Sequence, residues 1–415
     1  MAAPRINSQR LNDSLATLGR IGETPDGMMR LAFSPADVEA RRYVTGLMTA
    51  AGLSVRLDTA ANIIARREGS EPSLPAIALG SHTDTVPNGG KYDGALGVLG
   101  AIECLQPLED LSFITRHPVE VLDFTNEEGT RYSRWLYGSR AMAGLHEADD
   151  LTAVDAEGVP VGDRLRDVGG DIQRIAEAQR RSEEFAAYLE LHIEQGPVLH
   201  STGVPVGTVT AITGRVALEV TLRGFANHAG TTPMSARRDA LLAASRVVQA
   251  VNSIATEEEV CRVGTVGIVR VSPGADNVIP GHAELAVEFR DEGMGRLDDA
   301  ERRLRQICQE VASASNVEID VAQLGVTDSS PMSAGIQEIV AKAAQDHGFE
   351  TRSLPSGAGH DAQSMAVLCQ AGMIFVPSVD GISHSPNEYS TPEACANGAD
   401  VLLQTLLTID RQFNK

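Results

Sequence analysis

The sequence predicts an α/β protein with a mixed, largely parallel sheet, helices on both faces of that sheet, and an inserted domain of ferredoxin-like pattern. Over the first half of the chain, buried-strand patterns alternate with helical patterns, which is typical of parallel sheets covered on both sides. From about residue 213 the pattern changes to half-exposed strands and amphipathic helices, and residues 330–415 return to helices and a buried strand. The chain of 415 residues is also longer than a single hydrophobic core usually supports, so we expect two domains.

The first half contains a capped helix and three strands whose last residues are polar. The segment SPAD (34–37) combines a capping box with proline at the first helical position, and Gly52 is expected to close that helix. A second helix, rich in small residues, is predicted over 94–108. The predicted strands are 74–86, 119–129 and 187–196.

Residues 213–329 are predicted to form the inserted domain, and 1–212 together with 330–415 the domain that contains it. Within the insertion the patterns follow the order β-α-β-β-α-β, the signature of an antiparallel sheet with both helices on one face. The alternating strands are predicted at 215–224, 262–271, 282–291 and 317–324, and the amphipathic helices at 239–255 and 296–315. A last buried strand is predicted at 371–379.

Composition excludes some classes of partner. The 35 Lys and Arg residues against 56 Asp and Glu give a formal charge of −21, so nucleic acid is not an expected partner. The 5 cysteines are widely spaced and form no CxxC motif, which indicates free thiols in a reducing compartment. The start of the chain lacks the apolar region of a signal peptide, and no apolar run is long enough to span a bilayer. We therefore expect a cytoplasmic protein with no membrane association.

Polar side chains gather where the predicted strands end. His82 ends one strand, the adjacent Glu127 and Glu128 end a second, and His192 falls at the end of a third. Because the carboxyl ends of parallel strands meet at one edge of a sheet, chemistry in such folds collects there.

Two further segments add ligands of the same kinds. Asp93 lies in the glycine-rich segment PNGGKYDG, and His384 lies in GISHSPNEYS. Asp84 follows His82 closely and could bind the second ring nitrogen of that histidine, which would fix its tautomer. Imidazoles and carboxylates that converge in this way are what a site for two divalent metal ions requires.

Each of these features also has an ordinary structural explanation. The HTD segment could be a surface loop, Asp93 a turn residue, and the two glutamates acids that open a helix near Gly129. A pair of cations would, however, resolve the repulsion within the glutamate pair. If Glu128 is a ligand, its charge is neutralised, and Glu127 is then free to act as a base.

Five motifs in order resemble the N-carbamoyl-amino-acid amidohydrolase branch of the M20 metallopeptidase family. This branch includes L-carbamoylases, β-ureidopropionases, allantoate amidohydrolases and ureidoglycolate hydrolases. A histidine at position 192, followed by EQG, is the pattern of this branch, whereas the wider family commonly carries a carboxylate there. The resemblance covers nearly the whole chain, and its motifs are GSHTDTVPNGGKYDG, FTNEEGTRY, ELHIEQGPVL, NHAGTTPM and GISHSPNEYS.

The resemblance implies a di-metal catalytic domain. One ion would be held by His82 and His192 and the other by Glu128 and His384, with Asp93 bridging the two. Glu127 would be the general base that activates water and returns the proton to the leaving nitrogen. Zinc is the expected metal, and manganese, cobalt and nickel are alternatives because such ligand sets accept all of them.

The resemblance also implies how a substrate would be bound. Residues matching Gln195, Asn277 and Arg290 hold the carboxylate and amide groups of the substrate, and arginine is the side chain best suited to a carboxylate. From pattern alone, Arg290 would be a surface ion pair with Glu288 or Asp291, and Asn277 a plain turn residue.

Other parts of the family's site come from a loop and from a second subunit. Gly359 lies in a GHD segment that matches a loop lining the pocket, and whether the adjacent His360 contacts substrate stays open. In the family the inserted domain forms a homodimer and acts as a lid. The residue matching His228 reaches the site from the partner subunit and stabilises the developing oxyanion.

The expected reaction is hydrolysis of the carbamoyl or ureido C–N bond of a small carboxylate. An N-carbamoyl-L-amino acid would give the amino acid, ammonia and carbon dioxide. The alternatives are allantoate, ureidoglycolate or N-carbamoyl-β-alanine as substrate, an aminopeptidase or aminoacylase, and a metal-free scaffold on the same fold. Arg215 and His200 depart from the family pattern, and neither is a proposed ligand.

Overall fold

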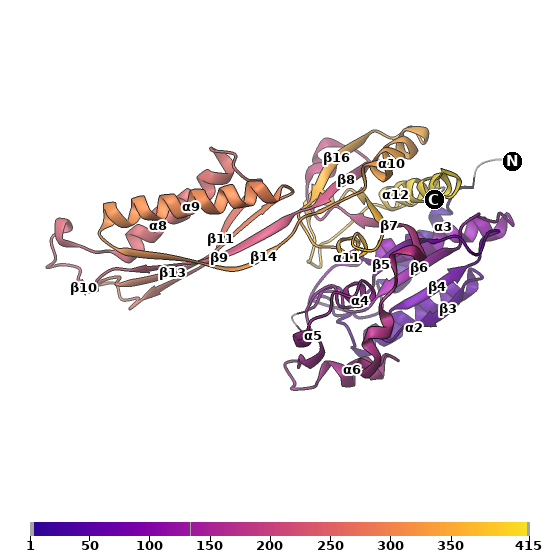
Figure 1. Cartoon of the computed structure of the whole chain (residues 1–415), viewed down its shortest axis with the longest axis horizontal. Coiled ribbons are helices and arrows are strands. Elements are labelled where there is room, and N and C mark those ends of the chain that lie inside the picture. Colours follow the sequence, from indigo (N-terminus) through magenta and orange to yellow (C-terminus); the bar gives the residue numbers. More distant parts are fainter. Residues whose placement is uncertain (1–3, 133, 413–415) are drawn as a thin grey trace. The chain divides into compact units, whose positions relative to one another are not determined.

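Figure 1 shows the computed structural model of the chain, which describes residues 4–132 and 134–412. The fold divides into two compact units. Unit 1 consists of Met1–Thr210 and Met332–Lys415, and unit 2 consists of Ala211–Pro331.

A nine-stranded mixed sheet forms the centre of unit 1, in the order β15-β8-β17-β7-β5-β6-β4-β3, with β16 paired to β8. The pairs β17–β7, β7–β5 and β5–β6 are parallel, and the pairs towards both edges are antiparallel. The strands are β3 (Ser54–Leu57), β4 (Ile63–Arg67), β5 (Ala76–His82), β6 (Val119–Phe124), β7 (Phe185–Ile193), β8 (Val206–Ile212), β15 (Ser330–Pro331), β16 (Thr351–Ser356) and β17 (Gln370–Val376).

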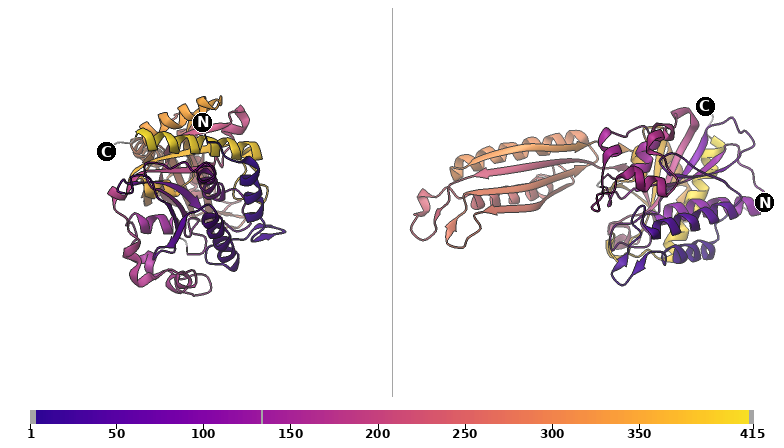
Figure 2. Two further views of the ribbon diagram at one scale, coloured as in Figure 1. Left: turned by 90° about the vertical axis from the view of Figure 1, so that its right-hand side faces the viewer. Right: turned by 90° about the horizontal axis from the view of Figure 1, so that it is seen from below.

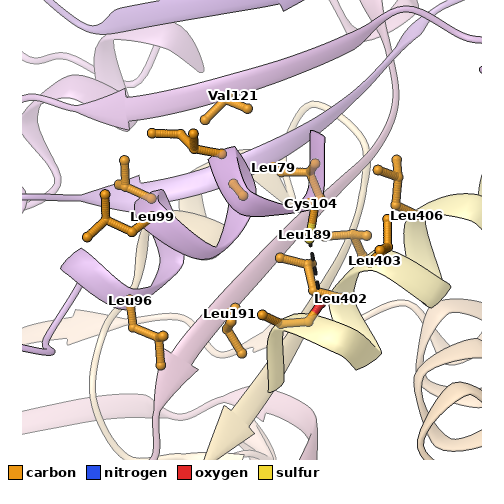
Figure 3. Packing of buried hydrophobic residues seen from close by; sticks show 14 of the residues in the cluster. Leu79, Leu96, Leu99, Cys104, Val121, Leu189, Leu191, Leu402, Leu403 and Leu406 are labelled. Carbon is orange, nitrogen blue, oxygen red and sulfur yellow. Dashed lines mark hydrogen bonds between the residues drawn. The ribbon is translucent and has the colours of Figure 1, made fainter. Parts of the chain in front are cut away.

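Helices cover both faces of this sheet, which explains why β5, β6 and most of β7 are buried along their length. On one face, Leu189 and Leu191 of β7 belong to a leucine-rich core with helices α3 and α12, drawn in Figure 3. Within this core the thiol of Cys104 donates to the carbonyl of Ala399 at 3.5 Å. On the other face, Glu190 accepts from the backbone of Ala362 at the start of α11. The helices named here are α3 (Ala95–Asp110), α11 (Asp361–Met365) and α12 (Pro392–Gln412).

The remaining elements of unit 1 surround this framework. Helix α2 (Pro35–Ala50) begins as predicted, because the side chain of Ser34 accepts from the backbone N–H of Asp37 at 3.1 Å. The other elements are α1 (Ser8–Leu18), β1 (Glu23–Thr24), β2 (Gly27–Met28), α4 (Tyr137–Met142), α5 (Ala148–Thr152), α6 (Val161–Asp167), η1 (Ile172–Ala178), η2 (Ser182–Glu184), α7 (Val198–Thr202), α10 (Ala334–Asp346) and η4 (Val379–Gly381).

Unit 2 is a four-stranded antiparallel sheet in the order β11-β13-β9-β14, and helices α8 and α9 lie side by side on one face of it (Figures 1 and 2). Residues of β13 alternate strictly between buried and half-buried, as expected for a central strand with one covered face. A small ribbon of β10 and β12 completes the unit. The elements of unit 2 are β9 (Gly214–Arg223), β10 (Asn227–His228), η3 (Met234–Ala236), α8 (Ala240–Thr256), β11 (Val263–Ser272), β12 (Val278–Ile279), β13 (His282–Asp291), α9 (Met294–Ser315) and β14 (Glu318–Thr327).

The predicted mixed α/β architecture with a parallel centre is confirmed. The antiparallel strands at both edges of the large sheet were not predicted, because their short patterns give no signal of direction. Within the described part of the chain, no helix has both the length and the apolar character needed to cross a membrane.

Candidate metal centre

Several of the predicted site residues lie at the carboxyl ends of the central strands of unit 1. His82 is the last residue of β5, and His192 lies one residue before the end of β7. Glu127 and Glu128 follow the end of β6. Because β7, β5 and β6 are parallel neighbours, these side chains share one edge of the sheet.

The carboxylate of Asp93 lies among three imidazoles. Its Oδ1 is 3.1 Å from Nε2 of His192 and 3.7 Å from Nε2 of His82. Its Oδ2 is 3.1 Å from Nε2 of His384. The two oxygens of one carboxylate therefore face different histidines.

Two groups of potential ligands share this carboxylate. His82, Asp93 and His192 form one group, and Asp93, Glu128 and His384 form the other, each with its ligand atoms within 4.8 Å of one another. Glu127 belongs to a neighbouring group with His82 and Glu128, and its Oε2 is 3.5 Å from Nε2 of His82.

The electrostatics of the glutamate pair match a cation site. Burial, followed by the nearby carboxylate of Glu128, raises the pKa of Glu127 well above its ordinary value. Burial and the charge of Asp93 do the same to the pKa of Glu128. Divalent cations would offset this repulsion, and imidazole nitrogens with carboxylate oxygens are the donors that zinc and its neighbours prefer. The residues present therefore suit the metal ions that the sequence predicts.

The two buried histidines present the ring nitrogen that a metal needs. Nδ1 of His82 is 3.0 Å from the backbone carbonyl of Asp84, and Nδ1 of His192 is 2.9 Å from the carbonyl of Ile193. A carbonyl only accepts, so each Nδ1 carries a proton and Nε2 is the nitrogen that a metal would take. Burial lowers the pKa of His192, but the hydrogen bond to Asp93 outweighs it and raises that pKa to about 9, so a bound cation would displace the proton on its Nε2. Burial also lowers the pKa of His82 to about 4, so this ring is neutral at neutral pH.

Asp84 acts differently from the prediction. Its Oδ1 lies 3.7 Å from Nδ1 of His82, while its backbone carbonyl makes the shorter contact. The carboxylate instead accepts the backbone N–H groups of Glu127 at 3.1 Å and Glu128 at 3.3 Å. Asp84 thus links the end of β5 to the glutamate pair.

Gln195 also joins this cluster. Its amide donates to Oδ2 of Asp93 at 2.8 Å and lies 3.4 Å from Nε2 of His384. Its carbonyl oxygen is buried and has no hydrogen-bond partner among the described residues. A buried acceptor of this kind is suited to an N–H group of a bound molecule.

Gly359 and His360 are neighbours in the chain and make different contacts. A Cβ atom at Gly359 would come within 2.0 Å of the indole of Trp135, so only glycine allows this indole to pack against the loop. His360 is buried, with its Nε2 2.7 Å from the hydroxyl of Ser356 and its ring centroid 4.4 Å from that of His192. His360 therefore packs against His192, a candidate ligand.

In unit 2, His228 and Asn277 lie close together. Strand β10 carries His228 opposite Val278 of β12, and the N–H of Ala229 donates to the carbonyl of Asn277 at 2.9 Å. Nδ1 of His228 accepts the backbone N–H groups of Gly230 at 3.0 Å and Thr231 at 3.2 Å. The proton of the neutral ring is therefore on Nε2, which makes this exposed nitrogen a donor.

Arg290 lies elsewhere in the same unit. His282 is the first residue of β13, and Arg290 lies near the other end of this strand. The Nε of Arg290 donates to Glu288 at 2.5 Å, and Glu288 also binds Arg215. Strand β13 follows directly after the β12 ribbon, and a strand of this length spans about 30 Å. One chain therefore holds Arg290 and His228 at opposite ends of its unit 2.

Three residues next to predicted site residues were not predicted from the sequence, namely the buried Glu388 and Glu190 and the more exposed Trp135. Glu388 accepts the backbone N–H of Asp93 at 3.1 Å, and Glu190 accepts from Ser81 at 2.7 Å beside His192. Trp135 packs on Gly359. Glu190 opens the motif ELHIEQGPVL and Glu388 lies in GISHSPNEYS, so both stand inside recognised motifs, whereas Trp135 lies in none of them.

Comparison with known proteins gives consistent matches. The family model described as Peptidase family M20/M25/M40 matches residues 78–408. The chain is 41% identical to an N-carbamoyl-L-amino acid amidohydrolase of Geobacillus stearothermophilus, covering 97% of this chain and 98% of that protein. It is 37% identical to a ureidoglycolate hydrolase of Arabidopsis thaliana, covering 97% of this chain and 86% of that protein. The crystal structure of a hydantoinase/carbamoylase family amidase from Burkholderia ambifaria matches with a TM-score of 0.92 at 34% identity, covering 100% of both chains.

Proposed function

Since the chain belongs to the peptidase family M20/M25/M40, we propose that it is a metal-dependent amidohydrolase that cleaves a carbamoyl or ureido C–N bond of a small carboxylate. The observation that carries this proposal is the carboxylate of Asp93, which is shared by two groups of candidate metal ligands. The bacterial relative supports an N-carbamoyl-L-amino acid as substrate, with an amino acid, ammonia and carbon dioxide as products. The plant relative supports ureidoglycolate as the alternative, and a further relative named allantoate deiminase supports allantoate.

The metal ligands in this proposal are those predicted from the motifs. His82 and His192 would hold one divalent ion and Glu128 and His384 a second, with Asp93 contributing a carboxylate oxygen to each group. Zinc is the expected metal, with manganese, cobalt or nickel as alternatives. Divalent ions bound there would polarise the substrate carbonyl and lower the pKa of water.

Glu127 serves as the general base. Its carboxylate lies beside His82 and is not needed in either group that contains Asp93. It takes a proton from the attacking water and later gives that proton to the leaving nitrogen. General acid–base catalysis of this kind contributes roughly 100- to 10,000-fold in rate.

The residues proposed to hold the substrate are Gln195, Gly359, Asn277, Arg290 and His228. The carbonyl oxygen of Gln195 accepts an N–H of the ureido group. Gly359 belongs to the loop that packs against Trp135, and the resemblance to the family implies that this loop lines the pocket. Arg290 and Asn277 bind the carboxylate and amide groups. His228 donates from Nε2 to the developing oxyanion, a role supported by the two backbone N–H groups that occupy its Nδ1.

The active protein is a homodimer through unit 2, and each site takes His228 from the partner subunit. The positions of Arg290 and His228 at opposite ends of one unit 2 support this arrangement. Its compartment is cytoplasmic, which the free cysteines support.

The test is an assay of ammonia release from N-carbamoyl-L-amino acids, N-carbamoyl-β-alanine, allantoate and ureidoglycolate, with dipeptides as the comparison. The Glu127→Gln variant should bind metal as the native protein does and lose at least about 100-fold in turnover, because the base is removed while the ligands remain. Glu183→Gln, at an exposed site, is the matched control and should be fully active.

Three results would contradict the proposal. Near-normal turnover by Glu127→Gln would remove the base. Dipeptide cleavage faster than ureido cleavage would favour an aminopeptidase. Less than about one divalent ion per chain after incubation with zinc or manganese would reject the metal centre itself.

A further inference from the structure

Glu388 is a buried carboxylate that the proposed chemistry does not use. It is 5% exposed and lies in the last motif, shortly after His384. Its Oε1 accepts two successive backbone N–H groups, from Tyr92 at 2.9 Å and from Asp93 at 3.1 Å. One carboxylate oxygen therefore holds the backbone of two successive residues, the second of which is Asp93.

Glu388 also reaches the side chain of Asp93 through a hydroxyl group. The Oγ of Ser383 lies 3.0 Å from Oε2 of Glu388 and 3.4 Å from Oδ2 of Asp93. This is the same oxygen of Asp93 that faces His384. The last motif therefore contacts both the backbone and the carboxylate of Asp93.

The glycine-rich segment before Asp93 is shaped to admit this carboxylate. A Cβ atom at Gly90 would lie 2.1 Å from both Cδ and Oε1 of Glu388. Any side chain at this position would displace the carboxylate from the two N–H groups. The glycine of one motif and the glutamate of another thus form one contact.

We propose that Glu388 is a positioning residue that fixes the backbone at Asp93, so that one oxygen of Asp93 faces His192 and the other faces His384. This inference rests on the proposed function, in which Asp93 bridges two metal ions. Without the contact, Asp93 would be free to rotate towards one histidine and leave the other group of ligands incomplete. Glu388 would then govern metal affinity without touching a metal ion.

The experiment measures zinc affinity and release in the full-length protein, by titration of metal-free protein in competition with a chelator. Glu388→Ala removes the acceptor and should weaken zinc binding roughly 10- to 100-fold, as loss of partners of metal ligands typically does, whereas Glu388→Gln keeps a carbonyl oxygen and should stay within about threefold. Glu393→Ala removes an exposed glutamate nearby and should bind zinc as the native protein does.

A second variant guards against a purely structural effect. Gly90→Ala keeps Glu388 but displaces its carboxylate, so it should lose affinity to a similar extent. Thermal unfolding of each metal-free variant shows whether the fold is intact. A residue that only anchors a loop would lower the unfolding temperature and leave zinc affinity unchanged.

The outcomes separate this inference from the proposed function. If the native protein binds zinc, and folded Glu388→Ala or Gly90→Ala binds it equally well, the positioning role is wrong while the metal centre stands. Equal loss in Glu388→Gln and Glu388→Ala would also overturn it, because the contact needs only an acceptor. If the native protein itself binds no metal, the proposed function fails and this inference fails with it.

Discussion

Single residues around Asp93 adopt backbone conformations that are costly for side chains other than glycine. Asn126, Gln195 and His384 have φ values of 52°, 58° and 53°. Each such conformation costs about 1–3 kcal/mol and persists only where its surroundings enforce it. All three lie beside the candidate metal centre. The strained backbone there sets the direction in which these side chains point.

Trp135 provides a direct optical test of the loop at Gly359. The chain has 1 tryptophan, and this residue is 41% exposed. Gly359→Ala should push the indole outward, shift its fluorescence to longer wavelength, and lower stability by about 1–3 kcal/mol through overpacking. If the loop lines the substrate pocket as proposed, KM should rise as well.

Gly357→Ala is the matched control, because a Cβ atom there meets nothing within 4 Å. It should leave the emission spectrum unchanged. An unchanged spectrum in Gly359→Ala would mean that Trp135 does not pack on this loop in solution.

At the scale of elements, the segment that follows β6 is tied to the start of α4. The backbone N–H of Leu136 donates to the carbonyl of Glu127 at 2.6 Å, and the N–H of Gly138 donates to that of Thr125 at 2.8 Å. Helix α4 is in turn held by Arg140, which binds both oxygens of the buried Asp150 at 2.9 Å. This ion pair therefore supports the element against which the proposed base is placed.

Asp150→Asn should lower stability at neutral pH, and the difference should shrink in acid. Against the effect of burial, hydrogen bonds from Arg140 and from the N–H of Glu147 lower the pKa of Asp150. A group whose pKa is depressed on folding stabilises the protein above its unfolded pKa, near 4, and this stabilisation is lost as the pH falls through the folded value. The free energy of unfolding should thus fall by about 3 kcal/mol at neutral pH, since a buried charge is left unpaired.

Urea denaturation between about pH 3 and pH 7 would measure this difference. Asp149→Asn removes a neighbouring, mostly exposed partner of Arg134 and should cost less than about 1 kcal/mol. A difference between the native protein and Asp150→Asn that grows as acid is added would contradict the predicted sign.

The sequence predicts elements well where their periodicity is strong. Helix 296–315 and strand 282–291 correspond to α9 (Met294–Ser315) and β13 (His282–Asp291), because long amphipathic patterns reflect one covered face. The ligands at strand ends were found for a similar reason, since buried strands that end in histidine or acid are easily recognised. Glu388 and Trp135 could not be found in this way. Their contacts, Asp93 and Gly359, are far away in the sequence, and only the folded chain brings them together.

At the scale of the whole molecule, the two edge strands of unit 2 differ from its central strands. β11 and β14 are largely exposed, whereas alternate residues of β13 and β9 are buried. Exposed edge strands can pair with a second copy of the chain. This feature supports the proposed homodimer.

Hybrid dimers test the shared site. Chains with His228→Ala and chains with Glu127→Gln should each be inactive alone, because each lacks one part of every site. After equal mixing and subunit exchange, activity should return to about a quarter of the native value, since half of the dimers are hybrids and each holds one complete site. The measurement is ammonia release, with exchange followed by mass-tagged chains.

Two mixtures complete this test. A chain that carries both His228→Ala and Glu127→Gln, mixed with native chains, controls for the effect of subunit exchange itself. Demonstrated exchange between the single variants without recovery of activity would place both residues of a site in the same chain.

The chain enters and leaves unit 2 at adjacent positions, because Ala211 pairs with Pro331 and Ile212 with Ser330. Inserts whose ends lie side by side are readily gained, lost or transplanted during evolution without disturbing the host fold. All candidate metal ligands lie outside this insert. A lineage built in this way can keep one ancestral hydrolytic centre and acquire new substrates by remodelling a single contiguous stretch of its gene.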